Sequence, residues 1–212
     1  MATAAEKQTH LRFISGEVPV SHKQAEQIGD LQEIIRGVSW EKLKDQTGSE
    51  DLVIEEHPNI NASILGHWMS VILISGRKLK IAFKVHYSSK NGGIIVGTKS
   101  KRRKSEITHL MIFDRLKEYC NLTGGSIKQC LGDENSKTGL SLPFVTRGFD
   151  EVLFIDRARR AGKQKIRSVW NLCAADYHVT CSSEVQILDW TCLDTIQRVE
   201  RTAETEGEIE FL

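Results

Sequence analysis

The feature that most constrains how this chain folds is the segment from Asp114 to Lys128, DRLKEYCNLTGGSIK. If each residue turns about 100° around a helix axis, the apolar residues of this region form one stripe, which is the pattern of a helix with a buried face. The stripe consists of Ile112, Leu116, Tyr119, Cys120, Thr123 and Ile127. We therefore predict that residues 106–131 form the longest helix of the protein and pack onto its core.

The opposite face of this helix carries four residues within a narrow arc: Asp114, Glu118, Asn121 and Gly125. Glu118 and Asn121 are three residues apart, so their side chains are neighbours on the helix surface. Gly125, one turn further on, has no side chain and leaves room for another surface to approach. The arc presents a carboxylate and a carboxamide on a rigid element. An ordinary solvent-exposed face has the same spacing, however, and Glu-x-x-Asn by itself is a weak pattern.

A β-hairpin is predicted before the helix. Two apolar runs, Trp68–Ile74 and Leu79–Tyr87, are joined by a short Ser-Gly-Arg turn. In the second run, Leu79, Ile81, Phe83, Val85 and Tyr87 alternate with Lys78, Lys80, Ala82, Lys84 and His86. This period of two predicts one buried face and one basic, solvated face. The central helix is expected to pack Leu116, Cys120 and Ile127 onto the sheet that contains this strand.

Weaker signals complete the prediction of the fold. Ser21 and Gln24 form a capping box at the start of a helix that ends near Gly37. Between the hairpin and the central helix we expect a turn at 91–93 and a strand at 94–96. Further strands are expected at 52–54, 142–146, 152–155, 166–172 and 179–188, with a helix around 193–199 and a last strand at 207–212 as weaker candidates. Strands and helices in this order, with hairpin-like connections, predict an α+β fold with an antiparallel sheet.

The chain has 212 residues, which is enough for one well-packed core. We expect residues 1–20 to form a flexible N-terminal arm and residues 21–190 to form the α+β domain. Residues 191–212 are then a C-terminal extension of uncertain structure.

Charge and hydropathy narrow the classes of function. The net charge of +1 gives no general attraction to nucleic acid or to anionic membranes. The basic run Lys99–Lys104 lies between a predicted strand and a helix without interleaved aromatic residues, so we interpret it as a solvated loop. No apolar run approaches the ~18 residues of a membrane span, and the first ten residues lack the order of a signal peptide. We expect a cytoplasmic protein that binds neither nucleic acid nor membrane.

Metal and nucleophile chemistry has little support in the sequence. The five cysteines are Cys120, Cys130, Cys173, Cys181 and Cys192. They contain no CxxC pair and no histidine at zinc-ligand spacing, so we expect reduced thiols and no metal site. The sequence contains no phosphate-binding glycine loop, no HExxH and no GxSxG motif. His86, His109 and His178 have no evident Ser, Cys or carboxylate partner.

The residues around the arc nevertheless resemble a known family. The segment E-Y-C-N-L-T-G-G-S-I-K, followed after a polar gap by S-L-P-F-V-T-R-G, is similar to the CheX/CheC family of chemotaxis phosphatases. That family has a Glu-x-x-Asn helix with Gly four residues after the Asn, here Gly125. A strand that opens with Pro, here Pro143, and closes near Gly, here Gly148, follows the helix. The resemblance covers roughly residues 65–190, and its specific part is Glu118 to Gly148.

The resemblance implies both a fold and an activity. The fold is CheC-like, an antiparallel sheet packed against a long central helix and additional helices. The activity is hydrolysis of the aspartyl-phosphate of a response regulator such as CheY. Glu118 would pair with an invariant lysine of the regulator and Asn121 would orient the attacking water, with Asp114 and Gly125 in contact with the partner. The protein would need no cofactor of its own, because the Mg²⁺ belongs to the phosphorylated regulator.

The chain departs from the family pattern in three ways. It has one copy of the motif, as CheX-type members do. No alanine-rich helix is evident between the hairpin and the central helix, and the tail after Trp190 has no counterpart. A second hypothesis is therefore a non-catalytic docking or dimerisation module in a signalling or flagellar-switch complex. The enzyme hypothesis requires Glu118 and Asn121 to be exposed and unpaired. We also expect a homodimer if strand Leu79–Tyr87 lies at the sheet edge, where its backbone groups are unpaired.

Overall fold

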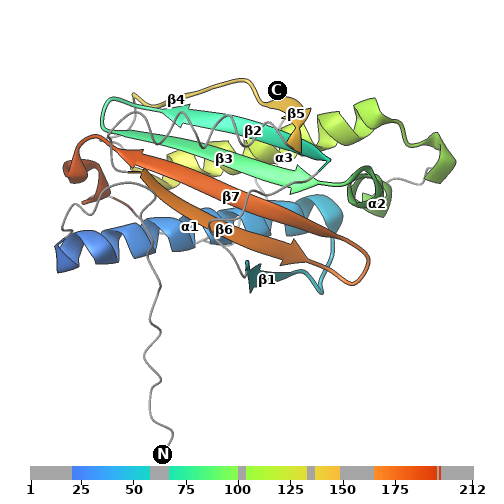
Figure 1. Ribbon diagram of the computed structural model, residues 1–212, viewed down its shortest axis with the longest axis horizontal. Coiled ribbons are helices and arrows are strands. Elements are labelled where there is room, and N and C mark those ends of the chain that lie inside the picture. Colours follow the sequence, from blue (N-terminus) through green and yellow to red (C-terminus); the bar gives the residue numbers. More distant parts are fainter. Residues whose placement is uncertain are drawn as a thin grey trace, which may run out of the picture.

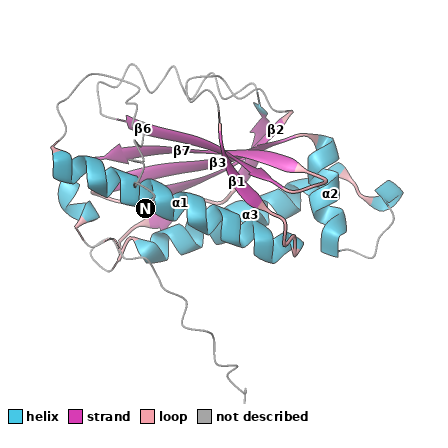
Figure 2. Ribbon diagram, turned by 90° about the horizontal axis from the view of Figure 1, so that it is seen from below, coloured by secondary structure: helices cyan, strands magenta, loops and turns pink. Residues whose placement is uncertain are grey.

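The computed structural model describes residues 21–57, 67–99, 104–132, 137–148, 165–194 and 196. Helices pack against a seven-stranded antiparallel sheet, and α1 and α3 lie side by side on the same face of it (Figures 1 and 2). The elements in chain order are α1 (His22–Thr47), β1 (Val53–Glu56), β2 (Trp68–Ser75), β3 (Leu79–Tyr87), α2 (Ser89–Lys99), η1 (Lys104–Glu106), α3 (His109–Cys130), β4 (Gly139–Leu140), β5 (Phe144–Arg147), β6 (Lys165–Cys173), β7 (His178–Ile187) and η4 (Trp190–Leu193). The predicted α+β fold with an antiparallel sheet is confirmed.

Two hairpins form the centre of the sheet. Strands β2 and β3 pair with Ile72 opposite Phe83, as the alternating pattern predicted. Strands β6 and β7 pair with Trp170 opposite Cys181, and each begins and ends within one residue of its predicted bounds. The strand order is β1-β6-β7-β3-β2, and both β4 and β5 pair with the far side of β2.

The core lies between this sheet and the two long helices. Phe83 is central to it, with ring centroids 6.0 Å from Tyr119 of α3 and 6.2 Å from Trp170 of β6. Leu116, Cys120 and Ile127 are fully buried in the same cluster, as predicted. The helix faces follow from the sequence because only residues at i, i+3 and i+4 spacing can reach the sheet together.

The second face of β3 is solvated only in part, contrary to our prediction: Lys80 is exposed, but Lys84 and His86 are not. Lys84 is 1% exposed and His86 is 2% exposed. The Lys84 Nζ atom lies 2.6 Å from Oε1 of Glu184 on β7, which compensates the buried charge. Burial, reinforced by the nearby positive charges of Lys84 and Arg167, lowers the pKa of His86 to about 3. Alternation identifies the residues that share a face, but it does not determine whether that face is covered.

Strand β3 is also not at the sheet edge. It lies between β2 and β7 and pairs with both along its length. Within the described sheet the edges are β1 on one side and β4 with β5 on the other. The premise of our dimer prediction is therefore wrong, because the backbone groups of β3 are already paired.

Two helices differ from their predicted lengths or types. Helix α1 has 26 residues against 22 in α3, so α3 is not the longest helix. Helix α1 continues through Gly37 and ends at Thr47, and the next residue, Gly48, has a φ of 72° and forms the left-handed C-cap. Burial of Leu43 against the core favours this continuation over a stop at Gly37.

The segment predicted as a turn and a strand at 91–96 is the helix α2. The Asn91 side chain donates a hydrogen bond to the His178 carbonyl at 2.7 Å, and the Asn91 backbone N–H donates to Ser88 Oγ. Ile95 and Val96 are buried by this arrangement. A helix therefore does lie between the hairpin and the central helix, although it contains no alanine. Its short apolar run did not distinguish a helix from a strand.

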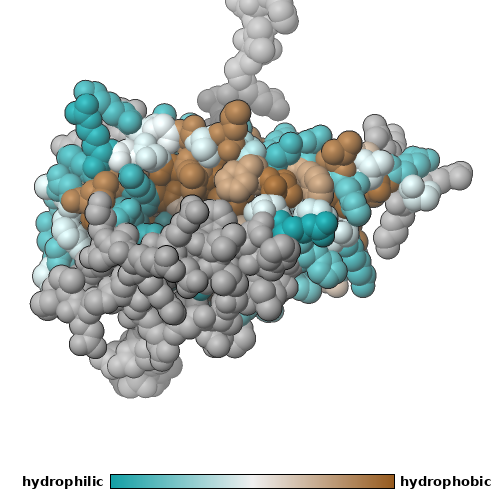
Figure 3. Space-filling model, turned by 45° about the horizontal axis from the view of Figure 1, so that its top comes forward, coloured by the Kyte–Doolittle hydropathy of each residue, from teal (hydrophilic) through white to brown (hydrophobic). Residues whose placement is uncertain are grey.

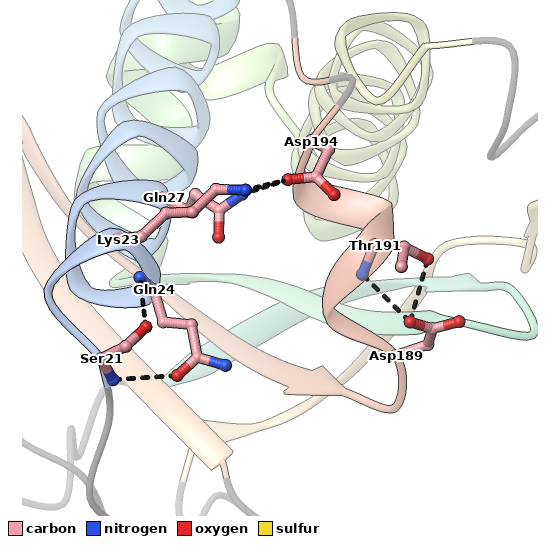
Figure 4. Close-up of polar contacts among 7 residues, drawn as sticks. All are labelled: Ser21, Lys23, Gln24, Gln27, Asp189, Thr191 and Asp194. Carbon is pink, nitrogen blue, oxygen red and sulfur yellow. Dashed lines mark hydrogen bonds and ion pairs between the residues drawn. The ribbon is translucent and has the colours of Figure 1, made fainter.

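The segment after β7 packs against the first helix (Figure 4). Lys23 and Gln27 of α1 each donate a hydrogen bond of 2.9 Å to Asp194 Oδ1, and the Lys23 bond lowers the pKa of Asp194. Cys192 of η4 is buried. The packed part of the chain thus reaches beyond residue 190.

The remaining predictions on the arm at 1–20, the strand at 152–155 and the last strand at 207–212 lie outside the described residues. So do residues 100–103 of the basic run.

Candidate functional site

The candidate site is on the outer surface of α3. Thr108 caps the helix, with its hydroxyl accepting a hydrogen bond from the Met111 backbone N–H at 3.3 Å. The buried residues of the helix are Ile112, Leu116, Tyr119, Cys120, Thr123, Gly124, Ile127 and Cys130. This face is held by the sheet and by α1, so the opposite face is presented by a rigid element.

The structure brings the four predicted site residues onto that opposite face. The side chains of Asp114 and Glu118 are 71% and 59% exposed, and Asn121 is exposed as well. No atom would lie within 4 Å of a Cβ placed on Gly125, so the surface there is open. The arc expected from helical spacing exists as a continuous strip in which Asp114, Glu118 and Asn121 are exposed and Gly125 is half-buried.

The two carboxylates of the strip are paired with cations of the same helix. The Lys117 Nζ atom lies 2.7 Å from Oδ1 of Asp114, and an Arg115 guanidinium nitrogen lies 3.7 Å from Oε2 of Glu118. Within the described part of the chain the Asn121 side chain makes no hydrogen bond. Asn121 therefore meets the condition that the enzyme hypothesis set, whereas Glu118 is in a long, exposed ion pair.

A buried hydrogen bond fixes the rotation of α3 one residue from Glu118. The Tyr119 hydroxyl donates to the Ser39 carbonyl of α1 at 2.9 Å. The Ser39 hydroxyl in turn accepts from Trp170 Nε1 of β6 at 3.1 Å. Burial raises the pKa of Tyr119 well above its ordinary value, so this hydroxyl remains a donor. Ser39 thus links α1, α3 and the sheet behind the candidate site.

The adjacent glycines of α3 have different environments. A Cβ on Gly124 would lie 3.0 Å from Ile72 Cδ1, so this glycine allows the helix to approach β2 closely. Gly125 faces outward. The sequence analysis identified Gly125 but missed Gly124, although its place beside the apolar stripe was a usable signal.

An aromatic group at the first turns of α3 was also missed. The Trp68 ring packs edge-on against Phe113 at 4.7 Å, and the Arg147 guanidinium lies 4.3 Å from the Trp68 ring centroid. His109 stacks on Phe113 at 6.1 Å. The spacing of four between His109 and Phe113 could have indicated this contact. The group anchors the start of α3 to the ends of β2 and β5.

Other kinds of site are not supported in the described residues. None of their His, Cys, Asp and Glu side chains form a group of three or more that could hold a metal ion. Among the same residues, no helix is long and apolar enough to cross a membrane. All five cysteines are free. A cavity of about 490 Å³ lies beside α1 and β1, lined by Ile34, Gly37 and Ile54 among others, and is separate from the strip on α3.

Comparison by sequence finds no relatives: no model of a known protein family matches, and no curated protein is similar. Comparison by structure does find similar proteins. The chemotaxis protein CheX from Vibrio vulnificus matches with a TM-score of 0.55 and 13% identity, over 74% of this chain and 99% of that one. A CheC-like protein from Shewanella matches with a TM-score of 0.54 and 15% identity, over 74% and 97%. This chain has the CheC-like fold.

Two matches to complexes show which partners proteins of this fold have. A chain of the Borrelia burgdorferi complex of CheX with CheY, beryllium trifluoride and magnesium matches with a TM-score of 0.56 and 13% identity, over 74% of this chain and 98% of that one. A chain of the FliG–FliM complex from Helicobacter pylori matches with a TM-score of 0.53 and 8% identity, over 82% and 98%. The CheC-like fold predicted from Glu118 to Gly148 is thus confirmed, and identities this low establish the fold alone.

Proposed function

We propose that this protein is a CheX-like phosphatase that hydrolyses the aspartyl-phosphate of a CheY-like response regulator. The observation that carries the proposal is the placement of Glu118 and Asn121. Both project from the exposed face of a helix whose other face is locked into the core, beside open space at Gly125. The similarity of the fold to CheX in a complex with CheY supports the same partner class.

The chemistry needs positioning more than a covalent intermediate. Water attacks the phosphorus atom, the bond between phosphorus and the carboxylate oxygen breaks, and inorganic phosphate and the free aspartate result. The Asn121 carboxamide can both donate to and accept from this water, and so can hold it in line without a shifted pKa. Glu118 would anchor a lysine of the partner, and Asp114 and Gly125 would contact its surface. The partner's own Mg²⁺ would neutralise the developing charge, so this protein supplies no cofactor.

The test is to incubate the protein with phosphorylated receiver domains and to follow phosphate release. Asn121→Ala should keep the affinity for the receiver domain and lose about 10²–10³-fold in kcat, because its contact matters chiefly in the transition state. Glu118→Ala should weaken binding as well, with the larger loss at low salt because an anchoring charge pair is removed. Glu26→Ala, an exposed change on α1 rather than on α3, serves as the control.

If the wild type and Asn121→Ala leave every tested phosphorylated receiver domain equally long-lived, the enzyme hypothesis is wrong. The second candidate is then a non-catalytic docking module in a flagellar-switch or signalling complex. The structural similarity to a chain of the FliG–FliM complex favours it, as does the ion pair that occupies Glu118. A docking module would bind its partner without shortening the lifetime of the phosphoryl group.

A homodimer through a sheet edge remains part of the proposal, at a different edge. The exposed apolar side chains at this edge are Leu73 of β2 (40%), Leu140 of β4 (37%), Leu142 between β4 and β5 (88%) and Phe144 of β5 (39%). Figure 3 shows apolar side chains gathered in a band across this side of the molecule. Strands β4 and β5 have no outer neighbour in the described sheet, so this edge can accept a second copy.

A further inference from the structure

The site carries a cation beside Glu118 that the proposed function does not yet use. Arg115 lies three residues before Glu118, and Asn121 lies three residues after it. At about 100° per residue, Glu118 therefore stands between the two, about 60° from each around the helix. The residues form one oblique row of an arginine, a carboxylate and a carboxamide.

The ion pair between Arg115 and Glu118 is weak enough to be exchanged. Its closest atoms are 3.7 Å apart, which is beyond hydrogen-bond length, and the Glu118 side chain is 59% exposed. Exposed pairs of this kind contribute little to stability. The other pair of the strip, between Lys117 and Asp114, is closer at 2.7 Å and does not involve Glu118.

The aliphatic stem of Arg115 is better packed than its charged guanidinium group. It is 29% exposed, so most of its stem is packed while the guanidinium stays at the surface. A guanidinium is planar and always charged, and it binds phosphoryl or carboxylate oxygens through two parallel hydrogen bonds. Among the described residues, Glu118 is the only acidic side chain that forms an ion pair with Arg115. When a lysine of the partner binds Glu118, Arg115 therefore loses this ion pair.

We propose that Arg115 exchanges partners on docking: Glu118 transfers from Arg115 to the partner's lysine, and Arg115 then binds the anionic group beside that lysine. This inference rests on the proposed function and adds a residue that recognises the phosphorylated state. In that state the partner has one more anionic group to offer, so Arg115 favours it over the unphosphorylated one.

The test measures the turnover of phosphorylated receiver domains and the Kd for the same domains loaded with beryllofluoride or left unloaded. Arg115→Ala should lower kcat/KM and the affinity for the loaded form by roughly 10-fold, with a smaller effect on the unloaded form. It should also flatten the salt dependence of binding. Arg115→Lys should recover part of the loss because it keeps the charge and removes the planar fork. Lys42→Ala is the matched control, since Lys42 pairs loosely with Asp45 at i,i+3 on α1.

A second background separates direct binding from support of Glu118. In Glu118→Gln protein, Arg115→Ala should still lower the affinity for the loaded domain by a similar factor. If that effect disappears, Arg115 acts only through Glu118 and the exchange is wrong. If the wild type is active and Arg115→Ala matches it, the exchange is also wrong while the proposed function stands. A wild type that neither binds nor dephosphorylates any receiver domain overturns both. Thermal unfolding of each variant checks that it remains folded.

Discussion

At the scale of single residues, the two adjacent glycines of α3 differ in what they do. Glycine costs a helix interior about 0.5–1 kcal/mol relative to alanine. Gly125 has open space around it, so Gly125→Ala should stabilise the protein by about that amount. At Gly124 the new Cβ would press on Ile72 Cδ1 at 3.0 Å, so Gly124→Ala should gain less or lose stability. Urea unfolding of the wild type and both variants measures the change in the free energy of unfolding. Equal stabilisation by the two substitutions would contradict the packing described for Gly124.

His86 should make the stability depend on pH. Burial lowers its pKa to about 3, while the unfolded chain has a pKa of about 6.5. The unfolded state therefore binds more protons between these values. The contribution of neutral His86 to the free energy of unfolding is therefore fully present above pH 6.5 and decreases as the pH falls toward 3. At pH 5.5 the loss from this residue is roughly 1 kcal/mol.

The measurement compares the wild type with His86→Met, which fills similar space and does not titrate. The free energy of unfolding of the wild type should fall more between pH 7.5 and pH 5.5 than that of the variant. Parallel curves for the two proteins would show that His86 is not the titrating group.

At the scale of elements, the Tyr119 hydroxyl connects α3 to α1. Tyr119→Phe leaves the Ser39 carbonyl without this donor and should cost about 1 kcal/mol of stability. Amide hydrogen exchange should rise in α3, because the helix that carries Glu118 is less firmly held. Tyr177→Phe is the matched control, since its hydroxyl binds Thr47 Oγ1 at the far end of α1. It should lower stability without raising exchange in α3, and an equal rise there would contradict the role given to Tyr119.

At the scale of the whole molecule, the available sheet edge determines how a second copy can bind. We expect a homodimer through β4 and β5, where Leu142 is 88% exposed. Leu142→Asp should shift the protein to monomer, because it introduces a charge into an apolar interface. Leu122→Asp, on the exposed side of α3, should leave the dimer intact. Light scattering at micromolar concentration measures both, and a monomeric wild type would remove the dimer while leaving the site unchanged.

The sequence by itself determined the features that depend on local periodicity. Leu116 and Ile127 had to face the core, and Glu118 and Asn121 had to face away from it, because helical spacing separates these positions on any helix. The pairing of β2 with β3 followed in the same way from alternation across a short turn.

Only the tertiary structure decided what lies against each face. Lys84 and His86 are buried on a face that the alternating pattern predicted to be basic and solvated. The tertiary structure placed β3 inside the sheet, and it turned residues 89–99 into a helix. The physical reason is that periodicity specifies which side chains point the same way, whereas burial and partners depend on segments far apart in the chain.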